Sequence, residues 1–78
     1  MHELIGLKKL RKKKRYTQQK VAMDLAISRE ALSLYENGKR NPGISLLISM
    51  SKYFNVSIDY LITGKNFESD GTANGGNT

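Results

Sequence analysis

The stretch ISREALSLYENGKRNP, residues 27–42, carries polar side chains that can both donate and accept hydrogen bonds. The guanidinium group of Arg29 can donate two parallel hydrogen bonds to one planar partner, and the carboxylate of Glu30 can accept them. Leu32 and Tyr35 suit a hydrophobic core, so a helix that buries them turns Arg29, Glu30 and Ser33 outward near its N-terminus. The stretch then runs into Asn-Gly-Lys-Arg, which adds two cations beside this helix.

The charge of the chain is unevenly distributed. Thirteen Lys and Arg residues stand against seven Asp and Glu residues, and eleven of the thirteen precede Pro42. Phosphate is the partner that such an asymmetry most often implies, and an excess of lysine for solubility is the alternative. The 78 residues contain no cysteine, so we expect one small domain that packing alone holds together.

Apolar spacing and capping residues predict five short helices, at about residues 3–14, 17–25, 28–36, 44–55 and 57–62. Thr17, Ser28 and Ser57 can each accept a hydrogen bond from a backbone N–H group of the first turn that follows. No alternation typical of strands persists, so the predicted fold class is all-α. We expect residues 1–64 to form one domain and the Gly-, Asn- and Ser-rich residues 65–78 to form a flexible tail.

The second and third predicted helices are joined by a very short linker, Ala26-Ile27. Because so short a linker does not let two helices lie antiparallel, they must cross steeply, as in a helix-turn-helix. Such a unit places the N-terminal residues of its second helix against base edges in the major groove.

The stretch TQQKVAMDLAISREALSLYENGKRNP resembles the signature of the Xre family, the helix-turn-helix repressors related to the phage Cro and cI proteins. Upstream, IGLKKLRKKKRYTQ is similar to the first helix of that family, and downstream, NPGISLLISMSKYFNVSIDYLITG is similar to its fourth and fifth helices. The resemblance covers about residues 4–64. It implies a five-helix lambda-repressor-like DNA-binding domain in a transcriptional regulator.

The resemblance also implies roles for individual residues. It places Arg29, Glu30, Ser33 and Leu34 at the base-contacting positions of the family. There Arg29 could donate two hydrogen bonds to guanine N7 and O6, and Glu30 could accept one from cytosine N4. Leu34 could touch a thymine methyl group or make a packing contact at the helix edge, and Glu30 could also stabilise the helix dipole. Contacts to DNA phosphates are implied at the start of the second helix and in the loop after the third, from Gln18, Asn37, Lys39, Arg40 and Asn41.

Two further pairs of residues occupy structural positions of the family. Arg11 and Glu36 match positions that form an ion pair between the first and third helices in some members. Arg15 and Ala26 stand where glycine is common at helix ends, although neither adopts a left-handed conformation as cheaply as glycine. We therefore expect a buried ion pair and some strain in the two turns.

The fourth predicted helix is apolar nearly all round, so one face suits the core and another suits a partner subunit. Complete burial within the five-helix pack is the alternative. The candidate residues for a dimer interface are Leu46, Met50, Tyr53, Tyr60 and Ile62. A two-fold dimer would place two recognition helices about 34 Å apart and would read an inverted repeat in double-stranded DNA. We therefore expect a homodimeric regulator that acts as a repressor.

Other classes of function fit the sequence less well. The main alternative is a protein-interaction module of the same fold, an antitoxin or anti-repressor partner, which would bind a regulatory protein and little or no DNA. An enzyme is not expected, because His2 is the only histidine and the acidic residues are scattered. The same scarcity of ligands argues against a metal site, and no cofactor is expected. The chain has neither a signal-like N-terminus nor an apolar run of roughly 20 residues, so we expect a cytoplasmic protein with no membrane contact.

Overall fold

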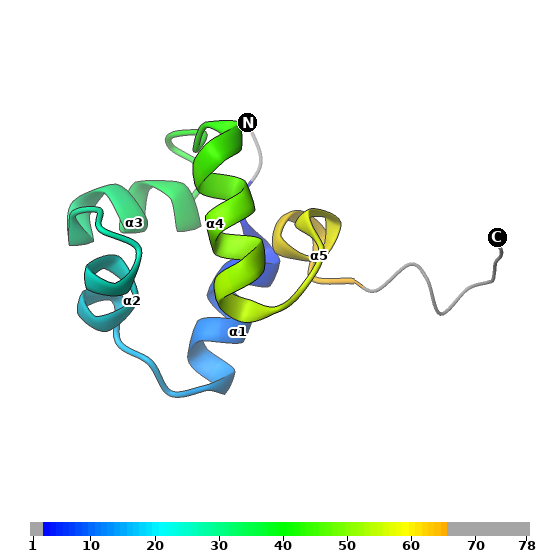
Figure 1. Ribbon diagram of the computed structural model, residues 1–78, viewed down its shortest axis with the longest axis horizontal. Helices are drawn as coiled ribbons and strands as arrows, with labels where there is room; N and C mark the ends of the chain where they lie inside the picture. Colours follow the sequence, from blue (N-terminus) through cyan, green and yellow to red (C-terminus); the bar gives the residue numbers. More distant parts are fainter. Residues whose placement is uncertain (1–2, 66–78) are drawn as a thin grey trace, which may run out of the picture.

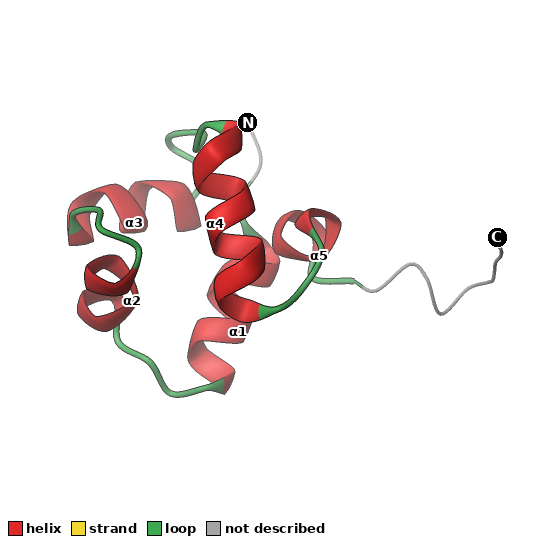
Figure 2. Cartoon of the chain, viewed as in Figure 1, coloured by secondary structure: helices red, strands yellow, loops and turns green. Residues whose placement is uncertain are grey.

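The computed structural model describes residues 3–65, in which five α-helices follow one another (Figure 1). Their bounds are α1 Ile5–Lys13, α2 Gln18–Asp24, α3 Arg29–Glu36, α4 Ile44–Phe54 and α5 Ile58–Thr63. Figure 2 shows short loops between the helices, and no strand occurs within the described residues. The predicted all-α class is therefore confirmed. His2 and most of the expected tail lie outside the described residues.

Three helices begin at the capping residues that the sequence predicted. Thr17, Ser28 and Ser57 each accept a hydrogen bond at 3.0 Å from the backbone N–H group three residues later. Each of these bonds satisfies a donor that the first turn of a helix cannot pair internally. The caps therefore fix where α2, α3 and α5 start, and so fix the direction in which their first residues point.

The hydrophobic core contains a fully buried side chain from every helix. Leu7 of α1, Val21 of α2, Leu32 of α3, Met50 of α4 and Leu61 of α5 are all 0 % exposed. All five helices bury apolar side chains in the same core. Separating any two of them would therefore expose apolar side chains of the other helices to water. This shared core holds the surface of α3 in a fixed place.

Helices α1 and α5 approach each other closely at a glycine. A Cβ atom added to Gly6 would lie 1.6 Å from the carbonyl oxygen of Tyr60, which is backbone and has little freedom to move. Glycine is therefore required at this point of the α1–α5 contact. No helix within residues 3–65 is long and apolar enough to cross a membrane.

The structure corrects one residue in the expected dimer interface. Met50 is 0 % exposed and belongs to the core of the single chain, so it offers no surface to a partner. Leu46, Met50 and Phe54 follow one another at four-residue spacing, and this stripe of α4 faces inward. Tyr53, Tyr60 and Ile62 are half-buried and also pack against the core, as Leu46 does.

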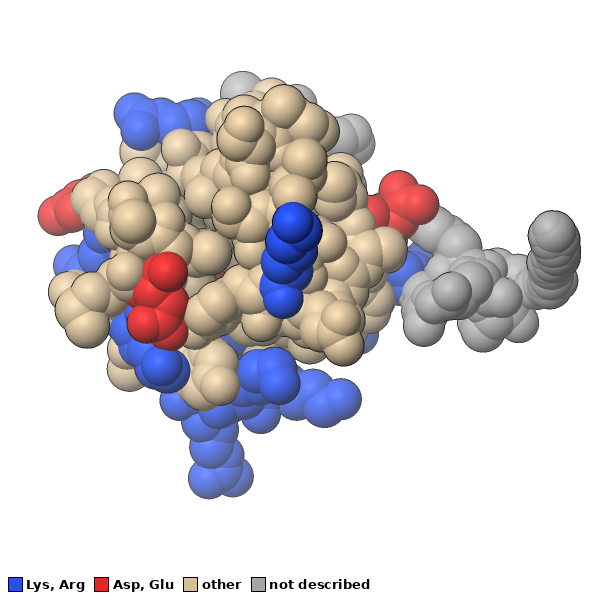
Figure 3. All heavy atoms as spheres, in the orientation of Figure 1, with Lys and Arg blue, Asp and Glu red and all other residues tan. Residues whose placement is uncertain are grey.

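The solvent side of α4 carries different apolar residues. Ile44 and Ile48 are 66 % and 42 % exposed, and Lys52 continues the same stripe. One apolar stripe of α4 is therefore buried within the chain, and another faces solvent. In Figure 3 the face over α4 is largely free of charged side chains.

Candidate nucleic-acid interface

Helices α2 and α3 lie next to each other at the end of the molecule opposite α5 (Figure 1). The turn between them is closed by two backbone hydrogen bonds, from the N–H of Ala26 to the oxygen of Met23 and from the N–H of Ile27 to the oxygen of Ala22. This pair of bonds is the Schellman arrangement, which requires a left-handed residue after the helix. Ala26 supplies that residue with φ 61°, so the helix-turn-helix predicted from the short linker is present.

Arg15 takes the same conformation at the end of α1, with φ 61°. Its N–H donates to the oxygen of Lys12, and the next N–H, that of Tyr16, donates to the oxygen of Arg11. Both positions where the sequence lacks the expected glycine are therefore left-handed. The strain anticipated in the two turns is located in these two residues.

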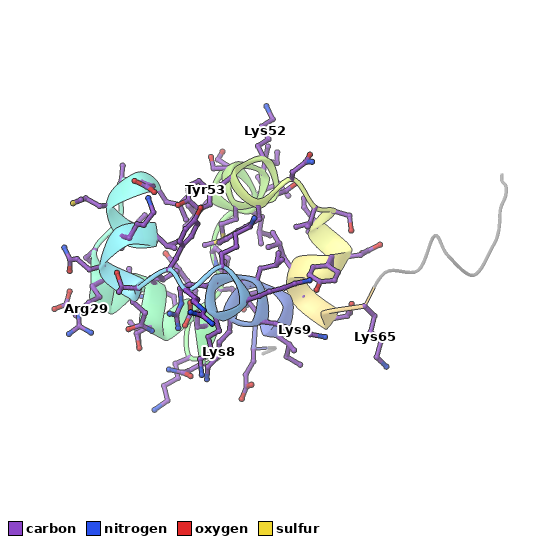
Figure 4. The ribbon with its side chains drawn as sticks, turned by 90° about the horizontal axis from the view of Figure 1, so that it is seen from below. Lys8, Lys9, Arg29, Lys52, Tyr53 and Lys65 are labelled. Carbon is purple, nitrogen blue, oxygen red and sulfur yellow. The ribbon has the colours of Figure 1, made fainter. Side chains whose placement is uncertain are left out.

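The four predicted base-contacting residues share one surface. Arg29 and Glu30 are exposed, Ser33 and Leu34 are half-buried, and all four line a single shallow depression on α3. Figure 4 shows Arg29 at the outer edge of the molecule, away from Lys65. A donor, an acceptor, a hydroxyl group and a methyl-bearing side chain are thus presented together, which is the set that base edges in a major groove can use.

A buried ion pair lies beneath this surface. Arg11 Nε donates to Glu36 Oε2 at 2.7 Å, and Arg11 Nη2 donates to Glu36 Oε1 at 3.1 Å. Glu36 is 1 % exposed, and Arg11 Nη1 also donates to the carbonyl oxygen of Tyr16 at 3.0 Å. Such burial is tolerated because both charges are paired and hydrogen-bonded. The pair joins the end of α1 to the end of α3, as the family resemblance implied.

Gln18 connects the ion pair to the surface of α3. Its Nε2 group donates to Glu36 Oε1 at 3.1 Å, and its Oε1 accepts from Arg29 Nη1 at 3.5 Å. Because a carboxylate can only accept hydrogen bonds, Glu36 determines which end of the Gln18 amide faces Arg29. One N–H of the amide is left over from these contacts, and the half-buried side chain stands at the first residue of α2.

The loop after α3 presents the remaining predicted phosphate-contacting residues. Asn37, Lys39, Arg40 and Asn41 are all exposed. The N–H of Lys39 donates to the oxygen of Leu34 at 2.9 Å, which ties the loop to the end of α3. The backbone at the start of this loop is therefore anchored while two cationic side chains face solvent.

Sequence reasoning missed a polar cluster between α2 and α4. Lys20 Nζ donates to Asp24 at 3.0 Å and lies 4.9 Å from the centre of the Tyr16 ring, and the hydroxyl of Tyr53 donates to the same carboxylate. Burial, helped by the hydrogen bond to Asp24, raises the pKa of Tyr53 to about 12. The hydrogen bonds from Tyr53 and Lys20 lower the pKa of Asp24. Only the four-residue spacing of Lys20 and Asp24 signals this cluster in the sequence.

The cluster engages two side chains, Lys20 and Tyr53, in contacts within the chain. Lys20 is engaged with Asp24, so its charge is already offset within the chain. Tyr53 is held against α2 by its hydroxyl group, which leaves it less available to a partner subunit than the sequence suggested.

Comparison with known proteins agrees with this geometry. A family described as helix-turn-helix matches residues 7–61. The chain is 47% identical over 63 residues to the uncharacterised HTH-type transcriptional regulator YqaE of Bacillus subtilis, a match that covers 81% of this chain and 54% of YqaE. It is 42% identical over 59 residues to the HTH-type transcriptional activator BcrR of Enterococcus faecalis, covering 76% of this chain and 29% of BcrR.

A third relative is the SPbeta prophage-derived HTH-type transcriptional regulator YonR of Bacillus subtilis, with 39% identity over 64 residues. That match covers 82% of this chain and 59% of YonR. The chain therefore spans between about a third and about three fifths of the length of these relatives. Since the family match covers more than half of the chain and includes α2 and α3, the chain belongs to the Xre-like helix-turn-helix family that its sequence resembles.

Proposed function

We propose that the protein is a sequence-specific DNA-binding regulator of transcription that reads its site with α3. The observation that carries this proposal is the shared depression lined by Arg29, Glu30, Ser33 and Leu34 at the exposed face of α3. Family membership and the names of the relatives support the general role. The residues on the depression supply the chemistry by which one DNA sequence is distinguished from another.

In the proposed complex, α3 enters the major groove with its N-terminal end toward the bases. Arg29 donates to guanine, Glu30 accepts from cytosine, and Leu34 contacts a thymine methyl group. Gln18, with its spare N–H, and the loop residues Asn37, Lys39, Arg40 and Asn41 hold the phosphates on either side. Each phosphate neutralised steepens the dependence of affinity on salt by about 0.9 log units per log unit of salt.

We further propose that the protein binds an inverted repeat as a homodimer and represses transcription. One subunit offers only one short recognition helix, and a second copy doubles the contacts to DNA. The apolar surface available for pairing includes the exposed Ile44 and Ile48 and the half-exposed parts of Leu46, Tyr60 and Ile62. Since the relative BcrR is named an activator, the sign of regulation is tested separately in a reporter strain that carries the recovered site upstream of a promoter.

The test is selection of binding sites from a randomised duplex pool at near-physiological salt, followed by sequencing. Wild-type protein is expected to recover an inverted repeat. Arg29→Ala is expected to relax the preference at one base pair in each half, at a cost of about 1–3 kcal/mol. Lys39→Ala is the matched control, because loss of a phosphate contact weakens binding to all sequences and leaves the recovered repeat unchanged.

The outcomes separate the parts of the proposal. Recovery of no enriched sequence would overturn the DNA-reading role and point to a protein partner. Recovery of a single, unrepeated half-site, together with a monomer in sedimentation equilibrium on that DNA, would overturn the homodimer.

A further inference from the structure

The end of α1 carries a cationic surface that the proposed recognition contacts do not use. We call it the α1 patch, and it consists of Lys12, Lys13, Lys14 and Arg15, four of the thirteen basic residues of the chain. All four side chains are exposed. The ion pairs among residues 3–65 are Arg11–Glu36 and Lys20–Asp24, so no carboxylate in that part of the chain pairs with the patch.

Figure 3 shows where these charges point. Lys and Arg side chains gather beneath the lower end of α1 and project away from the body of the molecule, with no acidic side chain among them in that view. The neighbouring Arg11 behaves differently, because it turns inward to Glu36. The basic run is thus divided into one structural arginine and four cations directed to solvent.

The α1 patch lies next to the start of α2. Arg11 Nη1 holds the carbonyl oxygen of Tyr16, and the N-cap of α2 at Thr17 follows directly. In Figure 1 the turn between α1 and α2 lies at one end of the α2–α3 unit, and the loop after α3 lies at the other. Cations therefore flank the proposed recognition surface on two sides, at the α1 patch and at Lys39 and Arg40.

Stability of the fold does not account for this arrangement. Cations near a helix C-terminus gain only about 0.3–1 kcal/mol from the helix dipole, and the effect fades within the last turn. Four adjacent like charges repel one another, and Arg15 additionally adopts φ 61°, which glycine would adopt at lower cost. A surface that is unfavourable in the free protein and uniformly cationic fits a polyanionic partner.

We propose that the α1 patch binds phosphates of the DNA that flanks each half-site, on the side where α2 begins. This inference rests on the proposed function and extends it, because it assigns a footprint longer than the bases that α3 can read. The flanking contacts carry charge and no sequence preference, so they raise affinity and salt dependence without changing the recovered repeat.

The experiment compares two duplexes that contain the recovered inverted repeat. One ends at the outer edges of the half-sites, and the other continues for about 10 bp of unrelated sequence on each side, roughly one helical turn. Dissociation constants are measured at several salt concentrations for the full chain. Wild-type protein is expected to bind the longer duplex about tenfold more tightly and with a steeper salt dependence. Two additional phosphate contacts by each of the two subunits would add about 3.6 to the slope.

Two triple variants with the same change in charge provide the contrast. The patch variant carries Lys12→Gln, Lys13→Gln and Lys14→Gln. The control variant carries Lys9→Gln, Lys52→Gln and Lys65→Gln, at lysines that Figure 4 shows away from Arg29. The patch variant is expected to bind the two duplexes with equal affinity and to keep the base preferences of the wild type. The control variant is expected to keep both the tighter binding to the longer duplex and the base preferences. Thermal unfolding followed by circular dichroism checks that all proteins fold.

If the patch variant still binds the longer duplex more tightly than the shorter one, this inference is overturned and the proposed function stands. An equal loss in the patch and control variants would also overturn it, because net charge alone would then explain the effect. If no repeat is recovered at all, the proposed function fails and this inference fails with it. Arg15→Gly adds an independent readout, since it is expected to raise the melting temperature while it lowers the gain from the flanks.

Discussion

Replacement of Ala26 by glycine is expected to stabilise the protein. Ala26 has φ 61° and closes the turn between α2 and α3, where the next N–H donates to the carbonyl oxygen of Ala22 at 2.9 Å. The Cβ atom of an L-residue crowds the following carbonyl oxygen in this conformation. Glycine has no Cβ atom, so it can make the same hydrogen bonds without that crowding.

The size of the effect follows from two opposing terms. The left-handed conformation costs an L-residue roughly 1–2 kcal/mol, and glycine loses about 0.5–1 kcal/mol more backbone entropy than alanine on folding. Ala26→Gly should therefore raise the free energy of unfolding by about 0.5–1 kcal/mol. For a domain of this size, that corresponds to an increase in Tm of about 2–8 °C.

The assay is thermal and urea unfolding followed by circular dichroism at 222 nm. Gly38 occupies the equivalent position at the end of α3 with φ 74°, so Gly38→Ala is the reverse control and should lower Tm by a similar amount. DNA affinity of the Ala26→Gly protein should stay within twofold of wild type, because the backbone of the turn is unchanged. A lower Tm for Ala26→Gly, or no change for Gly38→Ala, would refute the reasoning that the backbone conformation of these turns controls stability.

Three further predictions concern the α1–α5 contact, the buried ion pair and the hydroxyl group of Tyr53. Gly6→Ala should destabilise the protein by about 3 kcal/mol or prevent folding, because its Cβ would meet the backbone of Tyr60. Gly43→Ala has no atom within 4 Å and should cost at most about 1 kcal/mol, since Gly43 is the N-cap of α4, where alanine is less favourable than glycine. Equal melting curves for the two would contradict the close α1–α5 contact. Glu36→Gln should lower the free energy of unfolding by about 3 kcal/mol, because it leaves the Arg11 guanidinium buried without a counter-charge. Urea unfolding measures this change, and a loss under about 1 kcal/mol would argue that the ion pair contributes little to stability. Tyr53 has its pKa raised to about 12, so the stability it contributes is complete below pH 10 and lost as the pH rises toward 12. In absorbance titrations at 295 nm, wild type and Tyr53→Phe should differ by one tyrosine that ionises near pH 12, and a difference that titrates near pH 10 would exclude the raised value.

The parts of the structure that depend on local sequence were predictable. Ser28, for example, can satisfy a first-turn N–H group in any context, so the start of α3 follows from its position three residues before Ala31. The left-handed residues Arg15 and Ala26 were indicated by the family pattern, which places glycine there, because only about a third to a half of helices end on a left-handed residue. Family resemblance added the Arg11–Glu36 pair, which no local rule could place across 25 positions of sequence.

The inward face of α4 was less predictable, because its sequence ISLLISMSKYF offers apolar residues in every direction. Periodicity selects a face only when polar residues mark the opposite one, and here the single charge is Lys52. The face that the structure buries carries Met50 and Phe54, which are 0 % and 5 % exposed. Lys52, Ile44 and Ile48 share the opposite stripe, so the one charge did indicate the solvent side.

The contact between Gln18 and Arg29 shows what sequence reasoning leaves out at the site itself. Position alone assigned Gln18 to phosphate and Arg29 to bases, as if the two side chains were independent. The structure joins them through 3.1 Å and 3.5 Å contacts that begin at Glu36, so the buried carboxylate influences how the guanidinium group is presented. Residues that act together need not lie close in sequence: Gln18 is the first residue of α2, and Arg29 and Glu36 stand at opposite ends of α3. In the proposed complex, specificity at the base that Arg29 contacts is therefore expected to depend on Glu36, although Glu36 is only 1 % exposed.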